Sequence, residues 1–250
     1  MNPIPWRKKW MAVTCSHGQF IDNAIADMAL KFKDDYKPDT VMHLGDWNDQ
    51  TAFMRTAMAN PNSTEAAEPI DQDLAAGAAF VERLRPQYLF QGNHDHRPYR
   101  LLRHPNAIVR LAAQTVVDEM QRFAVSIGAE LVPYAGTHVA ASWRIIGDTA
   151  FGHGYAHGAR ACEQHVFLTG HSTVFGHTHR METQSAKTLG NKAGHTIGLI
   201  ADIRKLSYAH TNISTAGWSN GWAYGEYGDG WCNVEVYRCK TETSKIPVIA

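Results

Sequence analysis

The sequence lacks several features that would assign it to a particular class of protein. Nowhere do about eighteen apolar residues follow one another, which is the length that a membrane-spanning helix needs. The four cysteines lie far apart and include no C-x-x-C pair, a pattern that fits neither a disulfide scaffold nor a zinc ribbon. No apolar run of the kind found in a leader peptide follows the basic residues at positions 7–9. These absences predict a cytoplasmic protein that does not associate with membranes.

An excess of charge of either sign is also lacking. The 24 lysines and arginines balance the 24 aspartates and glutamates, so no long-range field draws the chain to nucleic acid or to an anionic membrane. Any contact with nucleic acid must therefore be local. No segment of the sequence indicates an obligate protein partner.

Histidine, by contrast, is abundant, with 14 residues in a chain of 250. The composition, 44% hydrophobic and 19% charged, can form a sizeable core, and one α/β domain over residues 1–250 is expected. Short apolar runs alternate with helical patterns, which is typical of βα units around a central sheet. Strands are predicted at 10–14, 40–44, 88–90, 143–146, 150–152 and 173–175, and helices at 20–32, 51–59, 66–84 and 111–123.

Three further segments complete the predicted organisation. The stretch at about 97–141 is mostly helical and is predicted to form a cap-like insert over the sheet. The stretch 216–231, rich in glycine and aromatic residues, is interpreted as an ordered loop, whose rings either stack on bases or fill space over a second sheet. Alternation of apolar and polar residues predicts a last strand at 232–237.

Five polar clusters follow the ends of predicted strands. Loops after the carboxyl ends of strands in an α/β sheet converge on one crevice, so residues far apart in the sequence can meet there. The clusters are CSH at 15–17, GDWND at 45–49, GNHD at 92–95, HG at 153–154 and GHTH at 176–179. Together they bring up to seven side chains of metal-ligand type to one place.

Such side chains suit a pair of metal ions. Two ions about 3.5–4 Å apart require oxygen and imidazole donors from several strands and one carboxylate that bridges them. Asp46 fits the position of the bridge. His177 and His179 are two residues apart and would face opposite ways on a strand, so both can be ligands only if the metals lie at the strand's end.

The ordered set resembles the calcineurin-like metallophosphoesterases. Their pattern is D-x-H, G-D-x-x-D, G-N-H-[DE], a lone His before Gly, and G-H-x-H, and the resemblance covers residues 15–179 with four of the five motifs complete. It implies a two-sheet β-sandwich flanked by helices and a phosphoric ester hydrolase. It also implies two divalent or mixed-valence metal ions, with manganese, iron and zinc as the candidates. The segments 92–102 and 218–222 are similar to phosphoesterases found in bacteriophage and bacterial genomes.

The resemblance implies a role for each matching position. Asp46 is shared between two metals, of which one is held by His17 and His179 and the other by Asn93, His153 and His177. His94 donates a proton to the leaving oxygen or steadies the phosphoryl charge, while a metal-bound hydroxide attacks phosphorus in line. Asp49 and Asp95 hydrogen-bond to the ligands and orient them.

One position departs from the family's pattern, because Cys15 stands where the family has its first aspartate. A thiolate keeps the negative charge but is a softer ligand, at about 2.3 Å from zinc, and favours iron or zinc over magnesium. We expect Cys15 to be a working metal ligand. The alternative is that the first metal site is weak or empty.

Arginine and histidine residues outside the motifs have a functional and a structural interpretation. Arg97 directly follows the GNHD cluster and can contact a substrate phosphate through two hydrogen bonds, whereas a solvated helix face accounts for the arginines after it. His43 lies inside a predicted strand and is expected to be packed. The histidines outside the motifs are expected at the surface or beside the ligands.

The substrate is expected to be a phosphate ester, with nucleotides and nucleic-acid ends as the favoured classes. The favoured function is therefore a binuclear metal-dependent phosphodiesterase or phosphatase. The alternative is a non-catalytic binding or assembly module on the same scaffold, with an impaired first metal site. Such modules lose metal ligands, whereas this sequence departs only at Cys15.

Overall fold

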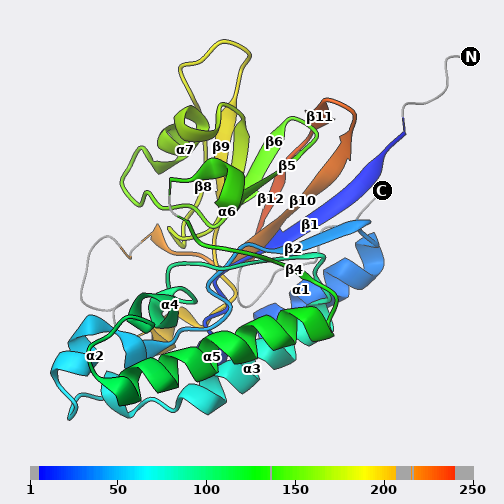
Figure 1. The fold of residues 1–250 in the computed structure, drawn as a ribbon. Coiled ribbons are helices and arrows are strands. Elements are labelled where there is room, and N and C mark those ends of the chain that lie inside the picture. The colour runs from blue at the N-terminus through cyan, green and yellow to red at the C-terminus, as the bar shows by residue number, and fades with distance from the viewer. Residues whose placement is uncertain (1–5, 136, 207–214, 216, 240–250) are drawn as a thin grey trace, which may run out of the picture.

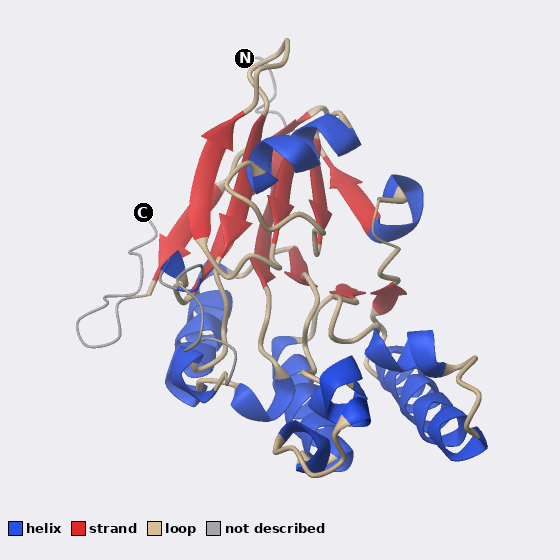
Figure 2. Ribbon diagram, turned by 90° about the vertical axis from the view of Figure 1, so that its left-hand side faces the viewer, coloured by secondary structure: helices blue, strands red, loops and turns tan. Residues whose placement is uncertain are grey.

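The computed structural model describes residues 6–135, 137–206, 215 and 217–239. They form two β-sheets that face one another, with helices on both outer sides (Figures 1 and 2). The α/β fold of two sheets flanked by helices, expected from the family resemblance, is confirmed. No helix of the described residues is long and apolar enough to cross a membrane.

The first sheet has the strand order β11-β10-β1-β2-β3-β4, with β12 also paired to β10. Strands β1 to β4 are parallel to one another, and β10 runs antiparallel to β1. Its strands are β1 (Lys8–Val13), β2 (Thr40–His43), β3 (Tyr88–Phe90), β4 (Glu130–Val132), β10 (Gly221–Gly228), β11 (Trp231–Cys232) and β12 (Glu235–Arg238). Because β10 pairs with β1, the C-terminal part of the chain completes the sheet that the N-terminal part begins.

The second sheet has the order β5-β6-β7-β9-β8. Its central strands β6, β7 and β9 are parallel, and the two edge strands are antiparallel to their neighbours. Its strands are β5 (Trp143–Ile146), β6 (Thr149–Gly152), β7 (Ser172–Phe175), β8 (Met181–Ser185) and β9 (Ala193–Ile197).

The core lies in layers on either side of the two sheets. Between the sheets, Trp10 and Phe90 from the first pack against Phe151 and Val174 from the second. The rings of Trp10 and Phe151 meet edge to face, with centroids 4.8 Å apart. All of these side chains are at most 1% exposed, so removing any large one of them would leave a cavity that costs about 3–5 kcal/mol.

Helices cover the outer face of each sheet. On the first sheet lie α1 (Asn23–Tyr36), α3 (Ile70–Leu84) and α5 (Ala107–Ser126), seen together below the strands in Figure 1. One cluster joins α1 to β1 and β10, and another joins α3 and α5 to β3. On the second sheet α7 (Ala161–Thr169) packs Ala161 and Cys162 against Phe175. The smaller helices are α2 (Arg55–Ala59), α4 (Arg97–Leu101) and α6 (Val139–Ser142).

The stretch 97–141, where a cap-like insert is expected, contains α4, α5 and β4 and enters α6. Strand β4 pairs in parallel with β3, so this stretch contributes an edge strand to the first sheet. Val116 and Met120 of α5 pack against Leu89 of β3 in one cluster. We propose that these elements and the two sheets make up a single domain.

All four predicted helices have different bounds in the structure, and the helix expected at 111–123 is longer, spanning Ala107–Ser126 as α5. Local backbone chemistry accounts for the three differences that follow. The helix expected at 20–32 begins at Asn23, because the Asp22 carboxylate caps it by accepting the N–H groups of Ala24 and Ile25. The extended backbone of Met54 divides the helix expected at 51–59 into a short 3-10 turn and α2. The helix expected at 66–84 begins only at Ile70, after the extended Pro69.

The C-terminal segment also differs from its expectation. Within 217–231, the described part of the expected ordered loop, Gly221–Gly228 forms β10. The strand expected at 232–237 is instead two short strands, β11 and β12, interrupted at Asn233 and Val234. Asn233 donates its backbone N–H to the Glu226 carbonyl, and its side chain accepts the N–H of Glu226. Both short strands pair with β10. The alternation of apolar and polar side chains is a local pattern, so it could not show that the two strands have the same partner.

Candidate metal centre

The five motif loops meet at one end of the sandwich. They follow β1, β2 and β3 in the first sheet and β6 and β7 in the second, and within each sheet these strands are parallel neighbours. Their carboxyl ends therefore lie on the same edge of each sheet, which is where ligands bind in open α/β sheets. The structure brings together the side chains that the sequence analysis placed in one crevice.

One buried group consists of Cys15, His17, Asp46 and His179, whose candidate ligand atoms all lie within 4.8 Å of one another. Within this group, Nε2 of His17 and Nε2 of His179 lie 3.1 Å apart. Cys15 is fully buried, and its thiol lies 3.2 Å from the Thr14 hydroxyl. The cysteine at the departing position thus points into the cluster together with the histidines and Asp46.

A second group adjoins the first at Asp46. Oδ1 of Asn93 lies 3.0 Å from Nε2 of His153 and 2.8 Å from Nδ1 of His177. Nε2 of His153 is also 3.2 Å from Oδ2 of Asp46. Asp46 therefore contacts both groups, which is the arrangement that a bridging carboxylate needs.

An unusual backbone conformation lets neighbouring residues point to the same centre. Cys15, His17, Asp46, His177 and His179 all have positive φ, between 51° and 62°. This left-handed region is uncommon for residues other than glycine, and such strain gathers at functional sites. His177 and His179 lie beyond the end of β7 at Phe175, so the opposite orientation expected along a strand does not apply to them.

Hydrogen bonds to Nδ1 fix the orientation of two imidazole rings. Nδ1 of His17 lies 2.7 Å from Oδ1 of Asp49, and Nδ1 of His153 donates to the Leu44 carbonyl at 2.8 Å. In both rings this leaves the lone pair on Nε2, directed toward the cluster. Nδ1 of His179 is buried and has no hydrogen-bond partner among the described residues, while its Nε2 faces His17.

Burial keeps His177 and His179 in the neutral form that binds metals. Burial lowers the pKa of His177 to about 3 and that of His179 well below its ordinary value, so both rings are neutral and carry a lone pair. Burial by itself raises the pKa of Asp46, but His153 and His94 hold that pKa well below its usual range. A neutral imidazole and an ionised carboxylate are the forms that bind divalent metals.

Cys15 differs from these residues. Burial, and then the charge of Asp46, raise the pKa of its thiol well above the ordinary value. Without a cation the side chain is therefore a neutral thiol, and a bound metal ion would have to displace the proton. The complete donor set of one thiol, imidazoles, an amide oxygen and one carboxylate fits iron or zinc better than magnesium.

His94 and Arg97 surround Asp49 on one side of the cluster. Nδ1 of His94 lies 2.8 Å from Oδ1 of Asp49, and its backbone N–H donates to Oδ1 of Asp46 at 2.8 Å. Arg97 donates to the Asp49 carbonyl at 2.6 Å, and its second guanidinium nitrogen lies 3.3 Å from Nε2 of His94. The Asp49 carboxylate thus contacts both His17 and His94.

Asp95 acts on the backbone of the loops. Its carboxylate accepts the N–H groups of Gly92 at 2.8 Å, Asp46 at 2.7 Å and Asn48 at 2.9 Å. These bonds join the GDWND loop to the GNHD loop. Asp95 therefore positions Asp46 through its main chain.

The sequence analysis missed Asp73, which lies in the first turn of α3. This carboxylate is 3% exposed and accepts N–H groups from Asp49 and Gln50. Burial raises its pKa from 3.8 to about 6. The available signal was an acidic residue on the buried face of an amphipathic helix, outside every motif.

The sequence analysis also did not place two aromatic residues, Tyr134 and Trp218, beside the candidate metal ligands. The ring of Tyr134 lies 5.8 Å from that of His153, and the ring of Trp218 lies 4.3 Å from that of His179. Burial and the charge of Asp46 raise the pKa of Tyr134 to about 12. Trp218 belongs to the aromatic stretch that the sequence analysis noted, whereas Tyr134 stood in no pattern.

The described histidines outside the motifs do not belong to the buried group of Cys15, His17, Asp46 and His179, and His210 lies outside the described residues. His43 is packed as expected, with Nε2 3.0 Å from the Ser16 hydroxyl, and burial lowers its pKa to about 3. His165 is also fully buried, and its Nε2 accepts the N–H of Tyr155 at 2.9 Å. It holds the loop that follows the candidate ligand His153.

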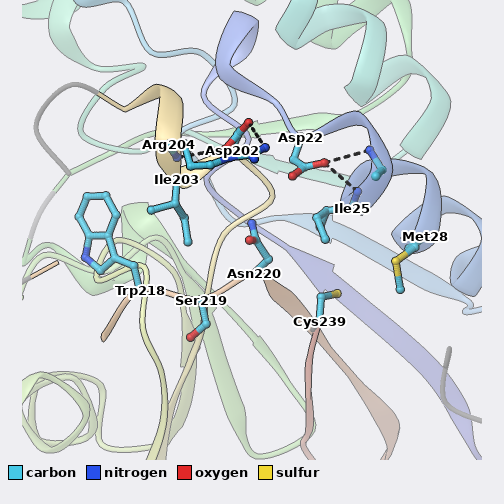
Figure 3. Close-up of a pocket in the computed structure, with 11 residues that line it drawn as sticks. Asp22, Ile25, Met28, Asp202, Ile203, Arg204, Trp218, Ser219, Asn220 and Cys239 are labelled. Carbon is cyan, nitrogen blue, oxygen red and sulfur yellow. Dashed lines mark hydrogen bonds and ion pairs between the residues drawn. The ribbon is translucent and has the colours of Figure 1, made fainter. Parts of the chain in front are cut away.

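A cavity of about 720 Å³ lies beside the cluster. Figure 3 shows Trp218 at one end of it and Met28 at the other, with Asp202, Arg204 and Asn220 between them. The cavity adjoins the candidate ligands at Trp218, whose ring lies 4.3 Å from that of His179. Its volume is in the range of small-molecule sites.

Comparison with known proteins identifies the family. The family model for calcineurin-like phosphoesterases matches residues 9–181, which is more than half of the chain. The chain belongs to the calcineurin-like phosphoesterase family. This phosphoesterase is therefore a phosphoric ester hydrolase of a metal-dependent family, which confirms the resemblance and the enzyme class expected from the sequence.

Solved structures similar to this phosphoesterase have low sequence identity. A metallophosphoesterase from Sphaerobacter thermophilus is 14% identical, with 95% of this chain and 90% of that chain covered and a TM-score of 0.48. Yfce, a phosphoesterase from E. coli, is 15% identical, with 86% and 87% covered and a TM-score of 0.41. Vacuolar Protein Sorting 29 from Cryptosporidium parvum is 12% identical, with 94% and 100% covered and a TM-score of 0.44. No curated protein matches the chain.

Proposed function

We propose that this phosphoesterase is a binuclear metal-dependent phosphodiesterase or phosphatase that acts on nucleotides or nucleic-acid ends. The observation that carries the proposal is the position of Asp46. Its Oδ2 lies 3.2 Å from Nε2 of His153 in one group, and Asp46 also belongs to the buried cluster with Cys15, His17 and His179. One carboxylate shared by two ligand groups is what a metal pair requires.

The two groups divide the ligands between two ions. Cys15, His17 and His179 would hold the first ion, Asn93, His153 and His177 would hold the second, and Asp46 would serve both. When bound, the ions supply Lewis acidity to the phosphoryl group and make water acidic enough to react near neutral pH. Iron, zinc and manganese are the candidates, in line with the mixed nitrogen, oxygen and sulfur donors.

His94 is the proposed proton donor to the leaving oxygen. Its Nδ1–H is directed to Asp49 at 2.8 Å, so Nε2 is the atom that would first take up a proton from solvent and then pass it to the leaving oxygen. Arg97 lies 3.3 Å from that Nε2 and is the proposed contact for the substrate phosphate. Asp49 fixes the tautomer and position of His94, and it does the same for the ligand His17.

The favoured substrate class rests on the neighbouring space. The cavity of about 720 Å³ that begins at Trp218 can accept a group of nucleoside size next to the cluster. It combines apolar side chains with Asp202 and Asn220, which offer polar partners to a heterocyclic base. The overall charge is balanced, so this local space, rather than a long-range field, would select between substrates.

Metal analysis and a substrate panel test the proposal. Purified protein should hold close to two metal ions per chain after exposure to manganese, iron or zinc. It should hydrolyse bis(p-nitrophenyl) phosphate only when loaded, and a panel of nucleotides and DNA ends then ranks the substrates. A metal content well under one ion per chain, with no gain in rate on adding manganese or iron, would instead favour a non-catalytic binding or assembly module.

A further inference from the structure

Tyr134 lies at the metal centre although no motif contains it. It follows β4, whose residue Val132 pairs with Phe90 at the end of β3, and β3 leads into the GNHD loop. Its position at the carboxyl end of a parallel strand places it on the same edge as the motif loops. The half-buried ring meets the ring of the proposed ligand His153 at 76°, with centroids 5.8 Å apart.

Neighbouring groups hold the phenol ring in place. The backbone N–H of Tyr134 donates to Oε1 of Gln91 at 3.3 Å. Its ring lies 5.7 Å from that of His96, which in turn stacks on Tyr99 at 5.5 Å and 3°. A tyrosine ring fixed on two sides loses little further conformational freedom when its hydroxyl binds a ligand.

The Tyr134 hydroxyl is not used by the fold. Within the described residues, the hydrogen bond of Tyr134 to Gln91 is made by the backbone, and no group bonds to its phenolic oxygen. Burial raises the pKa of nearby Tyr99, while the side chains of Gln91 and Gln121 act in the opposite direction. A positioned phenol without an internal partner, next to a cluster of ligand-type side chains, is a hydrogen-bond donor available to a substrate.

We propose that Tyr134 donates a hydrogen bond to a non-bridging oxygen of the substrate's phosphoryl group. The proposal rests on the proposed function and deepens it by adding a substrate contact on the side of the second metal site. His94 and Arg97 stand beside Asp49, on the side of His17. Tyr134 stands beside His153, so the two sides of the site would hold different oxygens of the same phosphoryl group.

The test compares Tyr134→Phe with the wild-type protein, both loaded with manganese. Binding of inorganic phosphate, measured by calorimetry, should weaken by about tenfold or more, the effect of losing one hydrogen bond to a charged group. Metal content should be unchanged. The value of kcat/KM should fall by a similar factor for aryl phosphodiesters with good and with poor leaving groups, because a non-bridging oxygen does not depart with the leaving group.

Tyr99→Phe is the matched control, because Tyr99 belongs to the same group of rings as Tyr134 and His96 but does not contact His153. This variant should bind phosphate as the wild type does. Equal phosphate affinity in Tyr134→Phe and wild type would overturn the proposal. A loss confined to substrates with poor leaving groups would also overturn it, by assigning the hydroxyl to the leaving oxygen. If the wild type hydrolyses no phosphate ester, the proposed function fails, and the phosphate titration still decides the role of Tyr134.

Discussion

Nδ1 of His94 lies 2.8 Å from Oδ1 of Asp49, deep inside the site. The same oxygen lies 2.7 Å from Nδ1 of His17, and Asp49 is 1% exposed. One carboxylate therefore orients the proposed proton donor and a proposed metal ligand together. Burial raises the pKa of Asp49, but His94 and His17 outweigh it and hold this pKa well below its usual range, so the carboxylate stays ionised between them.

Replacing His94 should separate turnover from metal binding. His94→Ala removes the proposed proton donor but no proposed ligand, so kcat should fall by about 100-fold or more while the metal content stays the same. The measurement is turnover of bis(p-nitrophenyl) phosphate, with metal content determined on the same sample. His138→Ala, at an exposed position before α6, is the control and should be fully active. Wild-type turnover in the His94 variant would show that the assignment is wrong.

Replacing Cys15 should alter the choice of metal. Cys15→Ser removes the soft donor from the cluster with His17, Asp46 and His179. Zinc affinity should fall by at least about tenfold, because loss of groups that merely support a ligand already costs that much. Competition with a chelator measures this affinity, and Cys232→Ser, which changes a cysteine in β11, is the control. Unchanged zinc affinity in Cys15→Ser would place the sulfur outside the coordination sphere.

Gly92 is a position where a single methyl group should damage the site. A Cβ at Gly92 would overlap with the Asp46 carboxylate and would come within 2.5 Å of its backbone nitrogen. Gly92→Ala should therefore displace Asp46, lower the metal content and cost about 1–3 kcal/mol of unfolding free energy. Thermal unfolding and metal analysis measure the two effects.

The control for Gly92 is Gly158→Ala, since nothing lies within 4 Å of a Cβ at that position. This variant should unfold at the wild-type temperature and bind metal normally. Equal metal content in Gly92→Ala and Gly158→Ala would show that Asp46 can bind metal from a displaced position.

Asp73 should make stability depend on pH. Its pKa rises from 3.8 to about 6 on folding, so the folded state binds a proton more tightly than the unfolded state. This contribution to stability is fully present below about pH 4 and is lost as the pH rises through about 6, and it corresponds to about 3 kcal/mol at most. With metal removed by a chelator, the free energy of unfolding of the wild type minus that of Asp73→Asn should decrease from pH 4 to pH 7.

Denaturant unfolding at several pH values measures this difference. Asp71→Asn is the matched control, because Asp71 lies in the same first turn of α3 but is exposed. The difference in unfolding free energy between wild type and Asp71→Asn should not decrease with pH in this way. If the difference in unfolding free energy between wild type and Asp73→Asn did not change with pH, the hydrogen bonds from the Asp49 and Gln50 N–H groups would offset the effect of burial on the pKa of Asp73.

Much of the site could be predicted from the sequence because its ligands stand directly after apolar strands. Asp46 follows β2 and His153 follows β6, and the parallel pairing of such strands brings their ends together. The strands β3, β5 and β6 could likewise be located, since short apolar runs bounded by turn residues leave little choice of structure. Strand β10 could not be located, because its pairing with β1 depends on residues more than 200 positions away.

The sequence by itself determined which kinds of donor atoms this phosphoesterase carries and the order in which they occur, because motif spacing and strand ends are local properties of the chain. Only the tertiary structure decided which of these side chains meet at the candidate metal centre. The positive φ of Cys15 and His179, the buried carboxylate of Asp73 and the ring of Tyr134 against His153 all arise from packing between distant segments. Such contacts depend on how strands, helices and loops meet in space, and no local pattern of residues encodes them.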